Sequence, residues 1–293
     1  MNKNNPLVSI IMSSYNHERF VEKAILSAIN QTYKDIELIV IDDGSKDRSP
    51  EILKNLQEKY GFHLELRANH GLVKTLNYAL KNLTNGKFVC ILDSDDYFHE
   101  SKIEKQVAVL EQNPDCGLCY NPIYYVDVND TIISDKIDKK NTLTGYIFEE
   151  FFRGDAHIPD GGVLIPLKVF QDIGYYDEDV ELEDYQLWFK ILSKYPVCYI
   201  DELLTYYRTH ETNVSNDEYK MLLWERQVIN KWKDHPVYEK SKPFVFNRWF
   251  AKFAKYNKKE ALIYLFKIIK YKTTYADKNF YKGIRRLLFY WKT

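Results

Sequence analysis

The feature that most constrains the fold is a repeated alternation of short, predominantly apolar segments with amphipathic ones. The apolar segments lie at residues 7–12, 37–41 and 87–92, and helical periodicity recurs at residues 20–29 and 49–60. Strands that are apolar at nearly every position are typical of a parallel sheet covered by helices on both faces. The N-terminal hundred residues are therefore predicted to form a doubly wound α/β structure.

Polar clusters at residues 13–16, 42–45 and 93–96 close these three predicted strands, and a fourth at 69–71 follows a short strand predicted at 63–66. Parallel strands end at one edge of the sheet, where ligands bind. One acidic pair could simply cap a helix, but capping does not explain four clusters. Asp93 and Asp95 leave their strand at alternating positions and offer oxygen ligands to a divalent cation bound to phosphate. The pattern predicts a metal and nucleotide-diphosphate site.

Several function classes are excluded by missing motifs. No G-x-G-x-x-G follows the first strand and no G-x-x-x-x-G-K-[ST] is present, which argues against a dinucleotide dehydrogenase and a P-loop NTPase. Cys116 and Cys119 form a C-x-x-C without a second pair, which excludes a four-thiolate zinc site. Both are expected to be buried strand cysteines without a disulfide, as in a reducing compartment. We see no signal peptide, so we expect a cytoplasmic location.

The chain beyond residue 115 has a looser pattern. We predict a strand at 116–126, a polar mobile loop at 129–143, a strand at 161–165, a helix that begins at Glu183, and helices from about residue 216 onward. The expected division is a domain at 1–215, with a nucleotide-binding half at 1–115 and an acceptor or catalytic half at 116–215, followed by a helical extension at 216–293.

Charge is distributed unevenly along the chain. The whole sequence has a net charge of −1, but residues 242–293 hold 11 Lys and 3 Arg against Glu260 and Asp277, a net charge of +12. Basic residues mixed with apolar and aromatic ones fit a helix that lies on an anionic membrane surface. The alternative is a solvated cationic face packed on the acidic body. No other feature supports nucleic-acid binding, and none is expected.

The segments at residues 6–16, 41–45 and 92–96 together resemble the inverting glycosyltransferases of family 2, which have the GT-A fold. The segments at 161–178, 183–188 and 207–210 agree with this resemblance. It implies an α/β, Rossmann-like GT-A sheet with a helical C-terminal extension. It also implies a hexosyl- or N-acetylhexosaminyltransferase that uses a nucleotide-diphosphate sugar, commonly a UDP-sugar, and a glycan acceptor.

The resemblance assigns roles to particular positions. A metal, Mn²⁺ or Mg²⁺, would bind Asp95 and His210. The acceptor side would include Gly161, Gly162 and Glu183. Apart from the resemblance, His157 in the loop before Gly161 is a candidate for contact with the donor or acceptor sugar. The nucleotide and donor would contact Ser13, Tyr15, Asn16, Asp42, Asp43, His70, Lys74, Asp93 and Ser94.

Asp184 is the predicted general base. Inversion by direct displacement needs one carboxylate to take the proton of the attacking acceptor hydroxyl. Asp184 lies at the start of a predicted helix, whose dipole stabilises the anion. The alternative is that Glu183 and Asp184 only cap this helix.

The acceptor expected by analogy is a lipid-linked surface polysaccharide unit, such as an O-antigen or capsule repeat, at the inner face of the cytoplasmic membrane. Two other functions are alternatives to this one. A nucleotidyltransferase that makes sugar nucleotides would need a Gly-rich, basic loop after the first strand, which residues 13–16 lack. A non-catalytic sugar- or nucleotide-binding protein would not need both Asp95 and Asp184.

Overall fold

The computed structural model describes residues 5–135, 142–159 and 161–290. The chain forms two compact units, one of residues 1–146 with 158–213 and one of residues 147–157 with 214–293. Residues 147–157, which the sequence places in the catalytic half, thus belong with the C-terminal helices.

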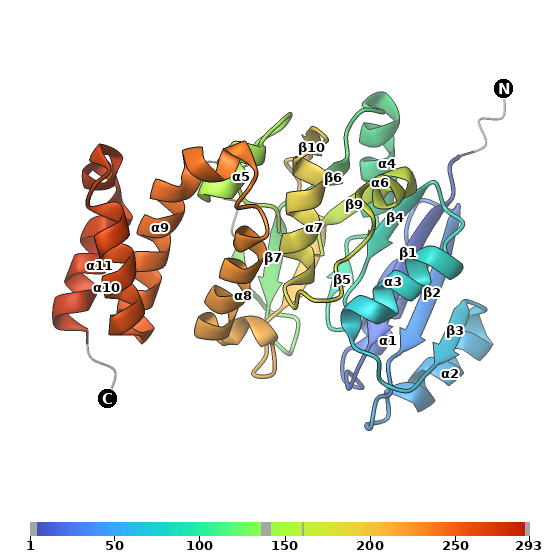
Figure 1. Ribbon diagram of the computed structural model, residues 1–293. Coiled ribbons are helices and arrows are strands. Elements are labelled where there is room, and N and C mark those ends of the chain that lie inside the picture. The colour runs from blue at the N-terminus through green and yellow to red at the C-terminus, as the bar shows by residue number, and fades with distance from the viewer. Residues whose placement is uncertain (1–4, 136–141, 160, 291–293) are drawn as a thin grey trace. The chain divides into compact units, whose positions relative to one another are not determined.

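Within the described residues, the first unit contains a seven-stranded sheet in the order β10-β6-β9-β4-β1-β2-β3 (Figure 1). The neighbours β1, β2, β3 and β4 are parallel, as predicted. Its strands are β1 (Val8–Ser14), β2 (Ile36–Asp42), β3 (His63–Leu66), β4 (Phe88–Ile91), β6 (Leu118–Tyr120), β9 (Val163–Pro166) and β10 (Val197–Tyr199).

Strand β9, which lies beyond the N-terminal hundred residues of the parallel prediction, runs the other way. This strand is antiparallel to both β4 and β6, so the sheet is mixed. The side chains of β9 are buried at every position, as they are in a central parallel strand, so the apolar pattern carries no sign of strand direction.

Helices cover both faces of this sheet (Figure 1). On one face, side chains of α1, α2 and α4 share a core with Ile10 of β1, Cys90 of β4 and Leu164 of β9. On the other face, α3 and α7 lie beside Ile91 and Ile165, which alternate with those residues. The helices of this unit are α1 (Val21–Ile29), α2 (Ser49–Tyr60), α3 (Leu72–Asn82), α4 (Lys102–Gln112), α6 (Leu167–Ile173) and α7 (Glu183–Leu192).

A second, smaller sheet has the order β5-β11-β7-β8. The prediction of one strand at 116–126 is wrong, because Asn121 and Pro122 separate β6 from a strand of this second sheet. The loop predicted at 129–143 contains a strand, and residues 136–141 lie outside the described residues. The strands are β5 (Tyr97–Phe98), β7 (Ile123–Val126), β8 (Ile132–Asp135) and β11 (Thr205–Arg208).

The cysteine prediction holds for Cys119, which is buried and free, and is wrong for Cys116. Cys116 forms a disulfide with Cys198, 82 residues later. The cause lies in the sheet: β10 pairs with β6 in parallel, with Cys198 opposite Cys119, and this brings Cys198 close to the start of β6.

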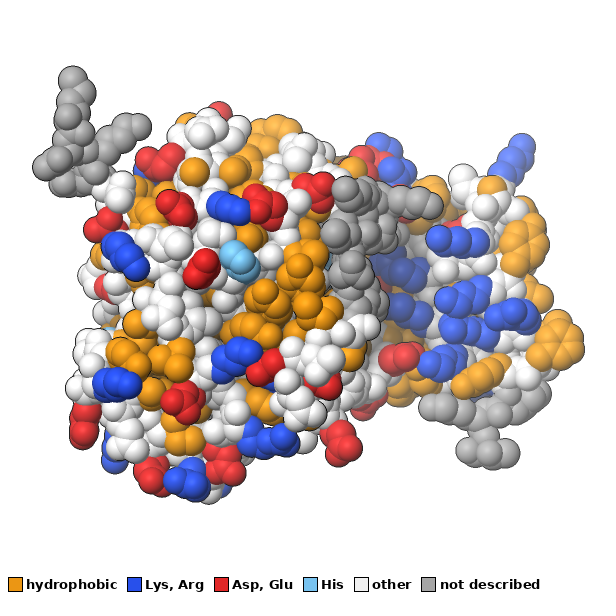
Figure 2. Space-filling model, turned by 180° about the vertical axis from the view of Figure 1, so that it is seen from behind, with side chains coloured by type: hydrophobic (Ala, Val, Ile, Leu, Met, Phe, Trp, Pro, Cys, Tyr) orange, Lys and Arg blue, Asp and Glu red, His pale blue; other side chains and the backbone are white. Residues whose placement is uncertain are grey.

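The second unit is helical, as predicted. Its α10 and α11 pack on the long α9, whose buried aromatic residues form the centre of the unit. Lys and Arg side chains gather on its surface (Figure 2). No helix in the described ranges is long and apolar enough to cross a membrane. The helices are α5 (Phe148–Arg153), α8 (Glu218–Asn230), α9 (Pro236–Tyr256), α10 (Lys258–Ile268) and α11 (Lys278–Phe289).

Candidate functional site

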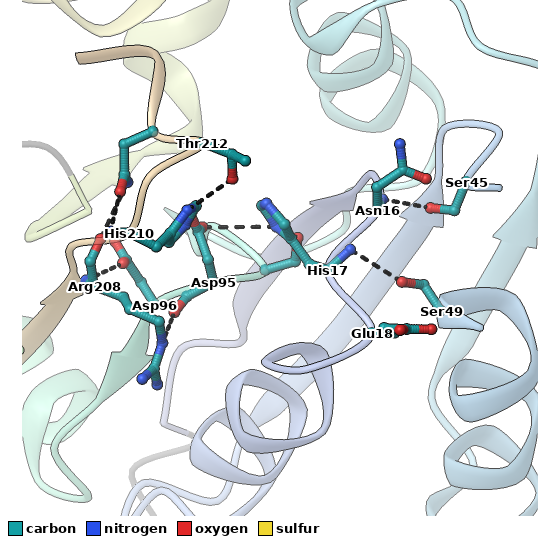
Figure 3. A network of polar contacts seen from close by, with 12 residues as sticks. Asn16, His17, Glu18, Ser45, Ser49, Asp95, Asp96, Arg208, His210 and Thr212 are labelled. Carbon is teal, nitrogen blue, oxygen red and sulfur yellow. Dashed lines mark hydrogen bonds and ion pairs between the residues drawn. The ribbon is translucent and has the colours of Figure 1, made fainter. Parts of the chain in front are cut away.

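The polar residues after β1, β2 and β4 meet at one edge of the sheet. The backbone N–H of Asp43 donates to the carbonyl of Ser14 at 2.9 Å, which joins the ends of β2 and β1. Asn16 then bridges the two loops: its N–H donates to Ser45 Oγ at 2.9 Å, and its Oδ1 accepts from the N–H of Lys46 at 2.7 Å (Figure 3). The predicted donor residues Asn16, Asp42 and Asp43 thus lie close together.

The carboxylate of Asp43 is almost fully buried and holds the loop before α3. It accepts hydrogen bonds from the N–H groups of His70 and Gly71, at 2.9 and 2.8 Å, and from Thr75 Oγ1 at 3.0 Å. Gly44 lies against this loop, and a Cβ there would come within 2.7 Å of the Asn69 nitrogen. Asp43 therefore fixes the shape of the loop, and a direct contact with a nucleotide base stays a prediction.

The other predicted donor residues divide by exposure. Asp42 is buried and accepts from the N–H and Oγ of Ser45, at 2.9 and 2.6 Å. Tyr15 is 47% exposed, and the side chains of His70 and Lys74 are also open to solvent. The side chains of Tyr15, His70 and Lys74 can therefore contact a ligand. Asp42 instead holds the loop that contains Ser45 in place.

A cluster of His17, Asp95 and His210 lies beside the donor loops (Figure 3). Asp95 Oδ2 is 2.9 Å from His210 Nε2, and Asp95 Oδ1 is 3.9 Å from His17 Nδ1. One ligand atom from each residue lies within 4.8 Å of the other two, which is a spacing that a single metal ion can occupy. Two imidazoles with one carboxylate suit a transition metal.

His17 was missed by the sequence-based prediction, which gave only Asp95 and His210 for the metal. Its signal was available, because His17 directly follows the polar loop 13–16 at the same edge of the sheet. Its Nδ1 also lies 2.7 Å from Ser94 Oγ, so the loop after β4 orients the ring. A cavity of about 470 Å³ adjoins His17 and His210.

The electrostatics of this cluster favour the protonation states that bind metal. Burial, offset in part by the charge of Asp95, lowers the pKa of His17. Burial alone would raise the pKa of Asp95, but the hydrogen bond from His210 and the charge of His17 outweigh it, and the pKa is lowered. A neutral imidazole and an ionised carboxylate are the forms that act as ligands.

Arg208 ties the strand that leads to His210 to the loop after β4. Its side chain is 2% exposed, and it donates from Nε to the Asp95 carbonyl at 2.8 Å and from NH1 to the Asp127 carbonyl at 2.9 Å. NH2 forms an ion pair with Asp130 at 2.6 Å. All three donor directions of the guanidinium are thus used to hold loops around Asp95.

Asp96 is buried at the centre of the same arrangement. Its Oδ1 accepts from the N–H of Arg208 at 2.8 Å, and within the described chain its Oδ2 has no hydrogen-bond partner. Burial, followed by the charges of Asp95 and Asp93, raises the pKa of Asp96 well above its usual value. Asp96 therefore holds the backbone of β11, and Asp95 is the residue of the pair that belongs to the cluster with His17 and His210.

Asp184 lies in the first turn of α7 and lines a narrow pocket that also includes Asp93, Glu183 and Gly161. Two buried hydrogen-bond donors line the same pocket, and neither Tyr176 OH nor Trp188 Nε1 has a partner among the described residues. Burial, followed by the charges of Asp184, Glu183 and Asp93, raises the pKa of the Tyr176 hydroxyl well above its usual value. The pocket combines carboxylates with neutral donors.

The two predicted glycines are placed differently with respect to this pocket. Gly161 has a φ of +71°. A Cβ added at Gly161 would lie 3.3 Å from Oδ2 of the buried Asp96 carboxyl. The Gly162 carbonyl accepts a 2.8 Å hydrogen bond from the buried side chain of Gln106, which anchors the segment. His157 belongs to the second unit, so its predicted contact with a sugar stays a prediction.

The model of glycosyl transferase family 2 matches residues 9–174 of the chain. The matched range includes the donor loops, His17, Asp95 and Gly161.

Curated relatives agree with the family match. An uncharacterized glycosyltransferase of Rickettsia felis is 32% identical over 269 residues, which is 82% of this chain but 41% of the relative. Another, from Rickettsia typhi, is 33% identical over 227 residues, or 73% of this chain and 68% of the relative. The Escherichia coli UDP-Glc:α-D-GlcNAc-diphosphoundecaprenol β-1,3-glucosyltransferase WfaP is 29% identical over 224 residues. These residues are 76% of this chain and 85% of WfaP. The chain therefore spans less than half the length of one of these relatives.

Solved structures share the fold at low sequence identity. S. aureus TarS 1–349 in complex with UDP-GlcNAc has a TM-score of 0.65 and 17% identity, over 96% of this chain and 81% of that one. The mannosyltransferase PcManGT from Pyrobaculum calidifontis, in complex with GDP-Man and Mn²⁺, has a TM-score of 0.62 and 15% identity. The match covers 98% of this chain and 88% of PcManGT.

Proposed function

The chain belongs to glycosyl transferase family 2, and from that premise we propose that it catalyses a metal-dependent, inverting transfer of a sugar from a nucleotide-diphosphate donor to a glycan acceptor. It has the GT-A fold of its structural neighbours with a helical C-terminal region, and its curated relatives are named as glycosyltransferases. The observation that carries the mechanism is the position of Asp93. It lines the pocket of Asp184 and precedes Asp95 of the metal cluster by two residues.

The residues of the cluster fit a divalent metal. His17, Asp95 and His210 would hold it, and imidazole ligands favour Mn²⁺ over Mg²⁺. When bound, such an ion stabilises negative charge on the diphosphate as it departs. Arg208 and Ser94 keep Asp95 and His17 in position for this role.

Asp184 would act as the general base. Its carboxylate takes the proton of the acceptor hydroxyl while that oxygen forms a bond to the anomeric carbon of the donor sugar. The bond from this carbon to the diphosphate breaks on the opposite side, and the nucleoside diphosphate leaves with the electron pair. The configuration is inverted and the proton ends on Asp184. Tyr176 and Trp188 line the same pocket and could donate hydrogen bonds to either sugar.

A UDP-sugar is the proposed donor, carrying a hexose or an N-acetylhexosamine. The name of E. coli WfaP gives UDP-Glc as its donor, and S. aureus TarS was solved with UDP-GlcNAc. A different base is the main alternative, since PcManGT was solved with GDP-Man. We propose that the predicted donor residues, Tyr15, His70 and Lys74 among them, contact this nucleotide sugar.

The proposed acceptor is a lipid-linked oligosaccharide of a surface polysaccharide, handled at the inner face of the cytoplasmic membrane. The name of WfaP gives a diphosphoundecaprenol-linked GlcNAc as its acceptor, which supports this class of substrate. Contact with the membrane surface through residues 242–293 would bring the enzyme to such an acceptor.

The test is a release assay for nucleoside diphosphate with a panel of nucleotide sugars and Mn²⁺, with the donor first chosen by thermal shift. Asp184→Asn keeps the size of the side chain and removes the base, so turnover should fall by about 10²- to 10⁴-fold while donor binding persists. Glu181→Gln, an exposed acid just before α7, is the matched control. Turnover that is unchanged in Asp184→Asn would overturn the assignment of the base.

A further inference from the structure

The region of excess positive charge, residues 242–293, holds its two acidic side chains in internal contacts. Glu260 pairs with Arg226 of α8 at 2.9 Å, and Asp277 caps α11 by accepting from the N–H of Asn279 at 2.8 Å. Among the described residues, neither carboxylate forms an ion pair with a lysine or arginine of α10 or α11. The charge of Arg286, followed by burial and by Lys278, lowers the pKa of Lys282, as expected where cations crowd together.

The outward face of α10 mixes cations with large apolar side chains. Ala261, Tyr264 and Ile268 turn inward and are buried. The opposite side of the helix is exposed, and Phe266 on it is 72% exposed. At helical spacing this side carries Lys259, Leu262, Ile263 and Phe266, and the turn that follows adds Ile269 and Lys270.

The outward face of α11 has the same composition. Gly283 marks the buried side of the helix, and Phe289 and Tyr281 are 78% and 59% exposed on the other side. The exposed side of α11 carries Lys278, Tyr281, Lys282, Arg285, Leu288 and Phe289. Figure 2 shows basic side chains gathered with apolar ones on the surface of this unit. Apolar side chains on a surface this charged are not explained by packing within the described residues.

Both helices are fixed on α9, so these faces are formed before any partner binds. Gly283 packs so closely on Phe250 that a Cβ would come within 2.4 Å of its ring. Arg286 NH1 donates to the Ala251 carbonyl at 2.9 Å, and Lys258 Nζ donates to the carbonyls of Arg286 and Leu287. The two helices, and with them the positions from which the outward side chains project, are therefore fixed without a ligand.

We propose that the outward faces of α10 and α11 bind the surface of an anionic phospholipid bilayer. The aromatic and aliphatic side chains enter the boundary between headgroups and acyl chains, and the lysines and arginines pair with lipid phosphates. A second copy of this chain fits poorly, because two such faces would bring like charges together. Membrane binding through this surface would bring the enzyme to a lipid-linked acceptor. That purpose rests on the proposed function.

The experiment is co-sedimentation of the full chain with vesicles of phosphatidylglycerol or of phosphatidylcholine. We expect binding to phosphatidylglycerol that weakens with salt. We also expect a fall of about tenfold or more in the partition coefficient for Lys270→Glu/Arg285→Glu and, separately, for Phe266→Ser/Phe289→Ser. These side chains are exposed, and unchanged thermal melting would show that each variant is folded.

The matched control is Lys54→Glu/Lys59→Glu/Tyr60→Ser, which makes the same kinds of change on the exposed side of α2. Equal binding to both vesicle types, variants that bind like the unmodified chain, or a dimer that the variants abolish would each overturn the proposal. Turnover of the donor in solution is measured in parallel. A chain that binds vesicles without turnover contradicts the proposed function alone, and turnover without vesicle binding contradicts this inference alone.

Discussion

The guanidinium of Arg208 donates a hydrogen bond to the backbone carbonyl of Asp95 at 2.8 Å, so the residue that ends β11 helps to position the carboxylate that lies between His17 and His210. The same strand continues to His210, 2.9 Å from Asp95 Oδ2. The loop after β4 and the segment after β11 are therefore joined at two points.

Arg208→Lys should weaken Mn²⁺ binding by about 10- to 100-fold, the usual effect of removing a residue that supports a metal ligand. Lysine keeps the charge but cannot reach the carbonyls of Asp95 and Asp127 and the carboxylate of Asp130 at once. The measurement is calorimetric titration with Mn²⁺. Arg48→Lys, at an exposed position before α2, is the control. Equal affinities in both variants would show that the Arg208 contacts do not position the cluster.

His17→Ala should also reduce Mn²⁺ affinity, by about tenfold or more, because it removes one of the three proposed protein ligands. Electron paramagnetic resonance of free Mn²⁺ reports binding without any need for turnover. His63→Ala, which removes a half-exposed imidazole at β3, is the control. If His17→Ala binds Mn²⁺ as tightly as the unmodified chain, the ion is held by Asp95 and His210 alone.

Tyr176→Phe should leave the protein as stable as before and lower its turnover. The hydroxyl is buried and has no partner among the described residues, so its loss removes an unsatisfied group. A hydrogen bond to substrate worth about 1 kcal/mol would correspond to a five- to tenfold fall in kcat/KM. Thermal melting and steady-state kinetics check the two parts. Tyr78→Phe, which loses a contact with Glu65, is the comparison. Unchanged kinetics would place Tyr176 outside the substrate site.

Glu225 should make the C-terminal unit sensitive to acid. Burial alone would raise the pKa of Glu225, but Arg248 and Lys252 outweigh it and lower the pKa to about 2. Because the folded pKa lies below the unfolded value of 4.5, the stabilisation is complete above pH 4.5 and is lost as the pH falls toward 2. The shift corresponds to roughly 3 kcal/mol.

Glu225→Gln should therefore lower the free energy of unfolding near neutral pH and flatten its dependence on pH between 4.5 and about 2. Denaturant unfolding at a series of pH values measures this. Glu239→Gln removes a mostly exposed carboxylate on α9 and should change little. A Glu225→Gln curve parallel to that of the unmodified chain would mean that Glu225 does not carry this pH dependence.

Local signals in the sequence predicted the elements whose ends are determined locally. Helix α2 begins at Ser49 and ends at Tyr60, as expected, because Pro50 starts it and Gly61 closes it with a φ of +74°. The amphipathic helix at Glu183 and the polar ends of β1, β2 and β4 were found in the same way.

Features that depend on distant parts of the chain could not be predicted. The antiparallel direction of β9 depends on its neighbours β4 and β6, and the bond between Cys116 and Cys198 depends on how β10 is placed. His17 joins Asp95 and His210 only because three separate loops converge. The burial of Asp43 is of the same kind, since its partners lie 27 to 32 residues away.

The disulfide between Cys116 and Cys198 closes a covalent ring that contains Gly161 and Asp184. A protease that cuts the chain once, anywhere between these cysteines, opens the ring but leaves both pieces attached to each other. The cut protein therefore keeps its full mass until a reductant is added, and only then separates into two fragments. The residues that line the pocket of Asp184 are thereby held on one molecule even after the backbone is broken.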